Sequence, residues 1–139
     1  MFKISLIFGS FFAMLSVVLG AFGAHYLKNH LSEYSLSIFQ TGVFYQFMHS
    51  LGILFVAVLS LNIENINFDL SIWFFILGII FFSGSLYFLS ITDMKWLGAI
   101  TPIGGLFFIL GWLILIFKSF KLWGLYEKFI INNIIISKF

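Results

Sequence analysis

Charge is the scarcest property of this sequence. Only 9% of the 139 residues are charged and 62% are hydrophobic, whereas about a quarter of a soluble domain is normally charged. Such a composition cannot cover an aqueous surface, but it suits a chain whose exterior faces the lipid bilayer. The net charge of +2 is also too small for a nucleic-acid footprint, so no nucleic acid is expected as a partner.

Two residue types are missing altogether. The absence of cysteine excludes disulfides, thiolate nucleophiles, cysteine zinc sites and ordinary iron–sulfur clusters. Arginine is absent too, and with it the bidentate fork that proteins favour for phosphate and carboxylate recognition. The five carboxylates lie in connections and in the tail, so we predict no acid pair, no proton relay and no enzyme activity. They are Glu33, Glu64, Asp69, Asp93 and Glu127.

What the chain has instead is four apolar runs. They predict an all-α polytopic membrane protein, a bundle of four transmembrane helices in one domain over residues 1–118. The expected spans are about 3–24, 41–61, 70–91 and 98–117. In residues 119–139, lysines on one helical side and aromatic residues on another predict an interfacial or cytoplasmic tail.

The first apolar run allows two interpretations. It resembles a cleaved signal peptide, with the small residues 20–24 as the cleavage region. However, small residues also recur along it at three- and four-residue steps, a pattern that lets another membrane helix approach closely. These residues are Gly9, Ala13, Ser16 and Gly20, followed by Gly23. A signal peptide has no need of such a face, so we take the run as the first span.

Other close contacts are expected in the last two spans. Gly84, between two serines, predicts a close approach in the third span. Thr101 and Pro102 suit the N-cap and the first position of the fourth helix. Gly104, Gly105 and Gly111 keep the packing face of that helix free of bulky side chains. An alternative starts that helix at Trp96 and kinks it at Pro102.

A polar stretch over residues 40–50 interrupts this apolar pattern. Gln46 and His49 share a helix face with Tyr45 beside them, and His25 ends the first span on the same side of the membrane. Because hydrocarbon offers no hydrogen-bond partners, we predict a buried polar cluster of His25, Tyr45, Gln46 and His49. In this cluster Gln46 would bind His49 and fix its tautomer. Such a cluster is a candidate site for a small polar ligand, a lipid headgroup or a partner.

The three histidines are the strongest candidate metal ligands. His25 and His49, facing each other in a bundle, would be able to hold a metal or a haem. The simpler interpretation is imidazoles satisfied by Gln46, Tyr45, a backbone carbonyl or water, with His30 facing solvent. No carboxylate lies beside them in sequence, so we expect no metal and no cofactor.

Four motifs, taken together and in order, resemble one known family. They are residues 20–25 (GAFGAH), residues 40–49 (QTG, YQ and H), residues 82–87 (FSGSLY), and residues 101–105 (TPIGG) with 111–112 (GW). The pattern resembles the YgdD-type family of small bacterial inner-membrane proteins, known as domain of unknown function 423, and is similar to eukaryotic transmembrane protein 256. The resemblance covers about residues 1–118 and implies four membrane helices without an established activity. The chain departs from the pattern at Tyr26 and beyond Ser119.

Two function classes fit these features. The first is a non-catalytic accessory protein that binds lipid, a membrane protein partner or a second copy of itself. The alternative is a small oligomeric transporter or channel, with a polar path through Tyr45, Gln46 and His49. The resemblance implies an inner-membrane location, and lysine placement predicts that both termini lie in the cytoplasm. Five lysines share the side of the termini and two lie opposite: Lys3, Lys118, Lys121, Lys128 and Lys138 against Lys28 and Lys95.

Overall fold

The computed structural model describes residues 2–63 and 66–136, with side chains as far as Glu127 except that of Leu125. Within these residues every regular element is a helix, which confirms the all-α prediction. Four helices in the described part are long and apolar enough to cross a membrane. Their bounds are Phe2–Asn29, Glu33–Asn62, Asp69–Thr92 and Lys95–Gly124.

Short helical segments join or interrupt the long helices. In chain order the elements are α1 (Phe2–His25), the 3₁₀ turn η1 (Leu27–Asn29), α2 (Glu33–Asn62), α3 (Asp69–Gly78), the π-helical η2 (Ile79–Ser83), α4 (Gly84–Thr92), the 3₁₀ segment η3 (Lys95–Ala99) and α5 (Thr101–Ile136). The segments α3, η2 and α4 follow one another without a break and form the third long helix.

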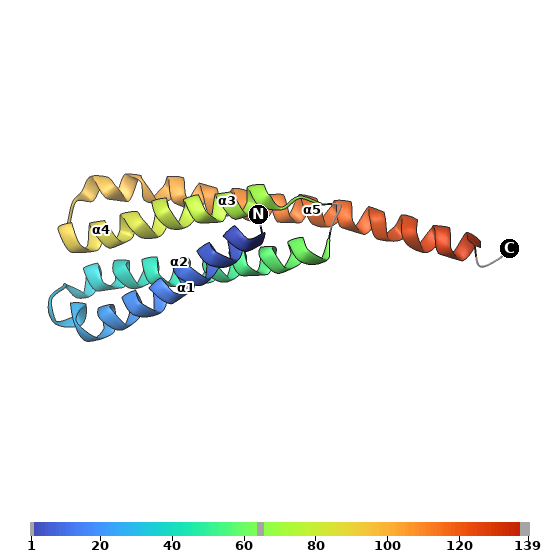
Figure 1. The fold of residues 1–139 in the computed structure, drawn as a ribbon. Coiled ribbons are helices and arrows are strands. Elements are labelled where there is room, and N and C mark those ends of the chain that lie inside the picture. Colours follow the sequence, from blue (N-terminus) through green and yellow to red (C-terminus); the bar gives the residue numbers. More distant parts are fainter. Residues whose placement is uncertain (1, 64–65, 137–139) are drawn as a thin grey trace.

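α1 and α2 form an antiparallel pair, visible in blue and cyan in Figure 1. Small residues of α1 set the spacing of this pair. A Cβ atom added at Gly9 would lie 2.8 Å from the side chain of Leu54, and one at Gly23 would lie 3.2 Å from the ring of Phe39. α1 and α2 therefore pack through close approach of their backbones at small residues, rather than through the interlocking large side chains of a soluble bundle.

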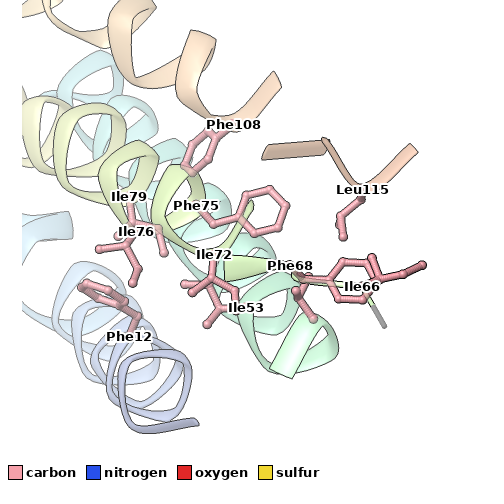
Figure 2. Packing of buried hydrophobic residues seen from close by; sticks show 11 residues of the cluster. Phe12, Ile53, Ile66, Phe68, Ile72, Phe75, Ile76, Ile79, Phe108 and Leu115 are labelled. Carbon is pink, nitrogen blue, oxygen red and sulfur yellow. The ribbon is translucent and has the colours of Figure 1, made fainter. Parts of the chain in front are cut away.

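The third long helix packs against α5 and against α2, and the buried core lies among these elements. Figure 2 shows Phe75 of α3 beside Phe108 of α5, with Ile53 of α2 and Ile72 of α3 below them. Phe75, Ile53 and Ile72 have no exposed surface, and Phe108 is 4% exposed. This core holds α2, α3 and α5 together beside the polar residues of α2.

Two helix boundaries differ from the sequence prediction. α2 begins at Glu33, eight residues before the predicted span, because Ser32 caps it by accepting a hydrogen bond from the Ser35 N–H at 3.1 Å. In the fourth span, Lys95–Gly124, the 3₁₀ segment η3 comes first and the α-helix α5 begins at Thr101.

The predicted tail is not a separate segment of the backbone. α5 continues through residue 119 to Ile136 as one helix, and Figure 1 shows it projecting beyond the other helices. Residues 137–139 of the predicted tail lie outside the described residues.

Candidate functional site

Gln46 lies at the centre of the bundle and is 2% exposed. Its Nε2 donates to the Phe12 carbonyl of α1 at 3.0 Å, and its Oε1 accepts from the Tyr87 hydroxyl of α4 at 2.9 Å. The carbonyl can only accept, so the orientation of the amide is determined. The Gln46 side chain, which extends from α2, thus forms hydrogen bonds to both α1 and α4.

Small residues make room for this junction. A Cβ atom at Gly42 would lie 2.8 Å from Tyr87 Cε1, so glycine lets the tyrosine ring pass close to α2. Ser16 adds a second side-chain donor to the Phe12 carbonyl at 2.7 Å, and Ser50 donates to the Gln46 carbonyl at 2.5 Å. Each polar atom of the Gln46 side chain thus has a partner, and the serine hydroxyls bond to backbone carbonyls of α1 and α2.

His49 forms a second, separate junction one turn further along α2. Its Nδ1 lies 2.8 Å from the Tyr45 carbonyl, and its Nε2 lies 3.2 Å from the indole nitrogen of Trp112 on α5. A carbonyl can only accept and an indole N–H can only donate. The imidazole is therefore neutral, with its proton on Nδ1. The ring also stacks on Phe108, with centroids 3.4 Å apart.

The partners of Gln46 and His49 differ from the predicted ones. Gln46 does not fix the tautomer of His49. Its amide binds Phe12 and Tyr87, and both imidazole nitrogens of His49 have partners other than Gln46. Tyr45 contributes its carbonyl to His49, while its side chain is 38% exposed.

Tyr87 and Trp112 were not predicted from the sequence as members of the two junctions. Both carry an N–H or O–H group in the middle of an apolar run, where such a group needs an acceptor. The sequence therefore indicated that each of these groups needs a hydrogen-bond acceptor. It did not indicate which residue on another helix provides that acceptor.

His25 is not brought to either junction. It is exposed at the end of α1, thirteen residues after Phe12, which corresponds to about 20 Å along a helix. His30 is also exposed, and its Nδ1 lies 2.8 Å from the Tyr26 carbonyl. Among the described residues no group of three His, Asp or Glu side chains could hold a metal ion. Both nitrogens of His49 are already used.

The residues predicted to pack fall into different environments. Gly104 has the closest contact, since a Cβ atom there would overlap the Phe82 backbone nitrogen. At Gly105 the same atom would meet only the Phe82 ring, at 3.7 Å, and at Gly20 it would lie 3.5 Å from Val43. Ala13 is half-buried.

Gly84 and Pro102 do not serve as close contacts within the chain. A Cβ atom at Gly84 would meet nothing within 4 Å, and Pro102 is exposed. Two close approaches lie elsewhere, at Gly78 against Phe108 and at Gly111 against Phe75, where a Cβ atom would overlap the ring. In these places an aromatic ring, rather than a helix backbone, occupies the space beside glycine.

Three hollows open on the surface of the described bundle. The α2–α5 groove, of about 680 Å³, is lined by apolar residues that include Phe55, Leu59, Trp112, Leu115 and Trp123. The α1–α2 groove, of about 360 Å³, lies beside Ser16, Gly20, Gly23, Val43 and Phe47. The connection hollow, of about 300 Å³, is lined by Lys28, Leu31, Glu33, Leu36, Ser37 and Gln40.

Comparison with known proteins gives this fold a family. Residues 19–105 match the family model described as "Protein of unknown function (DUF423)". The chain belongs to the DUF423 family. This confirms the resemblance read from the four motifs. The matched region contains Gln46, His49 and Tyr87 but not Phe12 or Trp112.

Curated relatives extend the match over most of the chain. A UPF0382 membrane protein of Staphylococcus haemolyticus is 48% identical over 122 residues, which are 88% of this chain and 99% of that protein. The UPF0382 membrane protein YwdK of Bacillus subtilis is 42% identical over 120 residues, 86% of this chain and 98% of its own length. No solved structure matches the chain. With four membrane-capable helices and relatives named as membrane proteins, the chain is a multi-pass membrane protein.

Proposed function

We propose that this DUF423 protein is a non-catalytic membrane protein that binds another membrane component, either a lipid or a partner protein. One observation carries the proposal. Each nitrogen and oxygen of the Gln46 amide and the His49 imidazole has a hydrogen-bond partner within the chain, while the hollows open on the outside of the bundle. The polar groups support the fold, and the grooves are available for a ligand.

The distribution of acids supports a role without catalysis. Glu33 and Asp93 lie beside the connections at one end of the bundle, Asp69 begins α3, and Glu127 is on the distal part of α5. None of these four carboxylates belongs to the junctions of Gln46 and His49. General acid–base chemistry needs such a group beside the reacting atoms.

The alternative of an oligomeric transporter has less support. Its path would need Tyr45, Gln46 and His49 along one open surface. Gln46 is 2% exposed between α1, α2 and α4, and His49 is 6% exposed against Phe108. A path through these side chains would have to break both junctions.

For its location we propose the cell membrane, the inner one where a cell has two, with both termini in the cytoplasm. The support is the uneven distribution of lysine, since positively charged connections remain on the cytoplasmic side. Lys3, Lys118 and Lys121 lie towards the end of the bundle that holds the α2–α3 connection, whereas Lys28 and Lys95 lie at the other end.

The test is extraction of the protein from its native membrane in polymer-bounded lipid discs, followed by mass spectrometry of everything retained. We expect one lipid class or one membrane protein to be enriched at a fixed ratio to the chain, relative to discs from the same membrane that lack the chain. In parallel, the protein in sealed liposomes should pass neither ions nor small solutes. Retention of nothing above the control discs, or flux abolished by Gln46→Leu, would overturn the proposal.

A further inference from the structure

The α1–α2 groove and the connection hollow are neighbours. Gln40 lines both of them, at the point where one ends and the other begins. The connection hollow lies beside η1 at the end of the bundle, and the α1–α2 groove runs from there towards the middle of α2. Because the two hollows share Gln40, one elongated ligand would be able to occupy both, with its polar part in the connection hollow and its apolar part in the α1–α2 groove.

α2 provides one wall of this site over its whole length. The lining residues follow one another at three- and four-residue steps, which places them on one helix face. In order they are Glu33, Leu36, Ser37, Gln40, Val43, Phe44 and Phe47, and Phe39 lines the groove from the edge of this face. From Glu33 to Phe47 this face extends about 21 Å, at 1.5 Å per residue. The apolar part, from Gln40 to Phe47, takes about 10 Å of it and stays within one leaflet of a ~30 Å core.

The polar end carries charges of both signs. Lys28 and Glu33 both line the connection hollow, yet they do not pair with each other within 4 Å. Ser37 and Gln40 add a hydroxyl and an amide to the same wall. A ligand head that carries one negative and one positive group would complement this pair, whereas a purely anionic head would face the carboxylate of Glu33.

The apolar end fits a hydrocarbon chain. Gly20 and Gly23 both line this groove and add no side chain to it. The Phe39 ring already lies close to Gly23, whereas a Cβ atom at Gly20 would be in ordinary contact with Val43. A transmembrane helix is about 10–12 Å wide with its side chains and packs along its whole span. A groove about 10 Å long that ends in a charged hollow suits an acyl chain better than a helix.

We propose that this site binds one phospholipid with a zwitterionic headgroup, its phosphate beside Lys28, its ammonium group beside Glu33, and one acyl chain along Gly20 and Gly23. This inference rests on the proposed binding function. It names the ligand that the protein binds and the site on the bundle that binds it. Each hollow lies within or at the edge of the size of known ligand sites, about 300–1,000 Å³.

The experiment measures lipid binding to the purified full-length chain by native mass spectrometry, after delipidation in detergent. Phosphatidylethanolamine is added in one series and phosphatidylglycerol with the same acyl chains in another. We expect one phosphatidylethanolamine per chain, bound about fivefold more tightly than phosphatidylglycerol, the effect typical of one exposed charge pair.

Two variants locate the site, and each has a control. Gly20→Leu should abolish the bound lipid by filling the apolar groove, and its matched control, Gly84→Leu, should not, because Gly84 faces open space. The double variant Lys28→Gln with Glu33→Gln should remove the preference between the two lipids. Both residues are exposed, so this variant remains informative even if Gly20→Leu fails to fold. Lys95→Gln is its control at the same end of the bundle.

Three outcomes would overturn the inference: equal binding of both lipids by the unaltered chain, preference for phosphatidylglycerol, or binding that no variant changes. If the native discs still retain a different component at a fixed ratio, only this site assignment fails and the proposed function stands. If the discs retain nothing, both fail.

Discussion

The side chain of Gln46 links three helices, because it extends from α2 and hydrogen-bonds both α1 and α4. In a membrane this link affects stability, because hydrocarbon offers no other hydrogen-bond partner. A hydrogen bond between membrane helices contributes only about 0.6 kcal/mol on average, since the separated helices also find partners. The larger effect comes from what is left behind when Gln46 is removed. The Tyr87 hydroxyl would then lie without its acceptor between α2 and α4, at a cost of about 1–3 kcal/mol.

We therefore expect Gln46→Leu to lower the free energy of unfolding by about 1–3 kcal/mol. Tyr87→Phe should cost less, because the Gln46 amide keeps its bond to the Phe12 carbonyl. The double variant should be more stable than the sum of the two losses predicts, since it leaves neither group unpaired. Reversible unfolding in mixed micelles measures all three. Strict additivity would show that the two side chains do not act as a pair.

The tautomer of His49 can be tested directly. Nitrogen NMR on the protein labelled in histidine should show His49 with its proton on Nδ1 and with Nε2 as an acceptor, because its partners are a carbonyl and an indole N–H. Trp112→Phe removes the donor, so it should shift the Nε2 resonance and leave the Nδ1–H in place. His30 is the internal control, as it is exposed and distant from Trp112. A proton on Nε2 of His49 would refute the assigned geometry.

The sequence predicted the burial of Gln46 and His49 but not their partners, and it wrongly placed the exposed side chain of Tyr45 among the buried residues of α2. Gln46 and His49 are three apart, a spacing that places them on one face and suggested a bond between them. The structure directs each to a different neighbour, Gln46 to α1 and α4 and His49 to α5. Spacing along one helix cannot rank partners on other helices, because these depend on packing at Gly42 and around Phe108.

At the level of whole elements, the start of α2 shows how hydropathy and helix formation differ. Residues 33–40 are polar enough to be read as a connection, and a membrane segment was expected only from residue 41. A helix needs a cap rather than an apolar run in order to begin, and Ser32 provides it, with Glu33 in the first turn at the positive end of the helix dipole. The early start also builds the wall of the connection hollow.

The crossing of α5 with the third long helix depends on one glycine of an adjacent pair. We expect Gly104→Ala to destabilise the protein by about 1–3 kcal/mol, the usual effect of overpacking, because its methyl group would meet the Phe82 backbone. Gly105→Ala is the matched control. It finds ordinary van der Waals space beside the Phe82 ring and gains about 0.5–1 kcal/mol of helix propensity. Thermal unfolding in detergent compares them, and equal effects would contradict a crossing at Gly104.

At the scale of the whole molecule, the number of spans and their order were readable from the sequence, because about 20 apolar residues are needed to cross a bilayer. The continuation of α5 was not. Lys118 and Lys121 suggested that the fourth helix ends there, yet lysine is a good helix former and can extend a helix beyond the hydrocarbon. The amino-acid composition indicates where the membrane ends. The helix itself continues for as long as its residues favour a helical backbone.

The distribution of lysines supports the proposed orientation of the bundle. With four spans the two termini share a side, and the sequence assigns five of the seven lysines to it. Positively charged segments close to membrane helices stay in the cytoplasm, while Asp and Glu contribute little, so the acidic α2–α3 connection does not oppose this orientation.

We expect a green fluorescent protein fused after residue 139 to fluoresce and an alkaline phosphatase fused there to be inactive. The same reporters fused within the 93–100 connection, after Lys95, should give the opposite pattern. Active phosphatase at the C-terminus would reverse the assignment and move the zwitterionic-lipid site to the cytoplasmic leaflet.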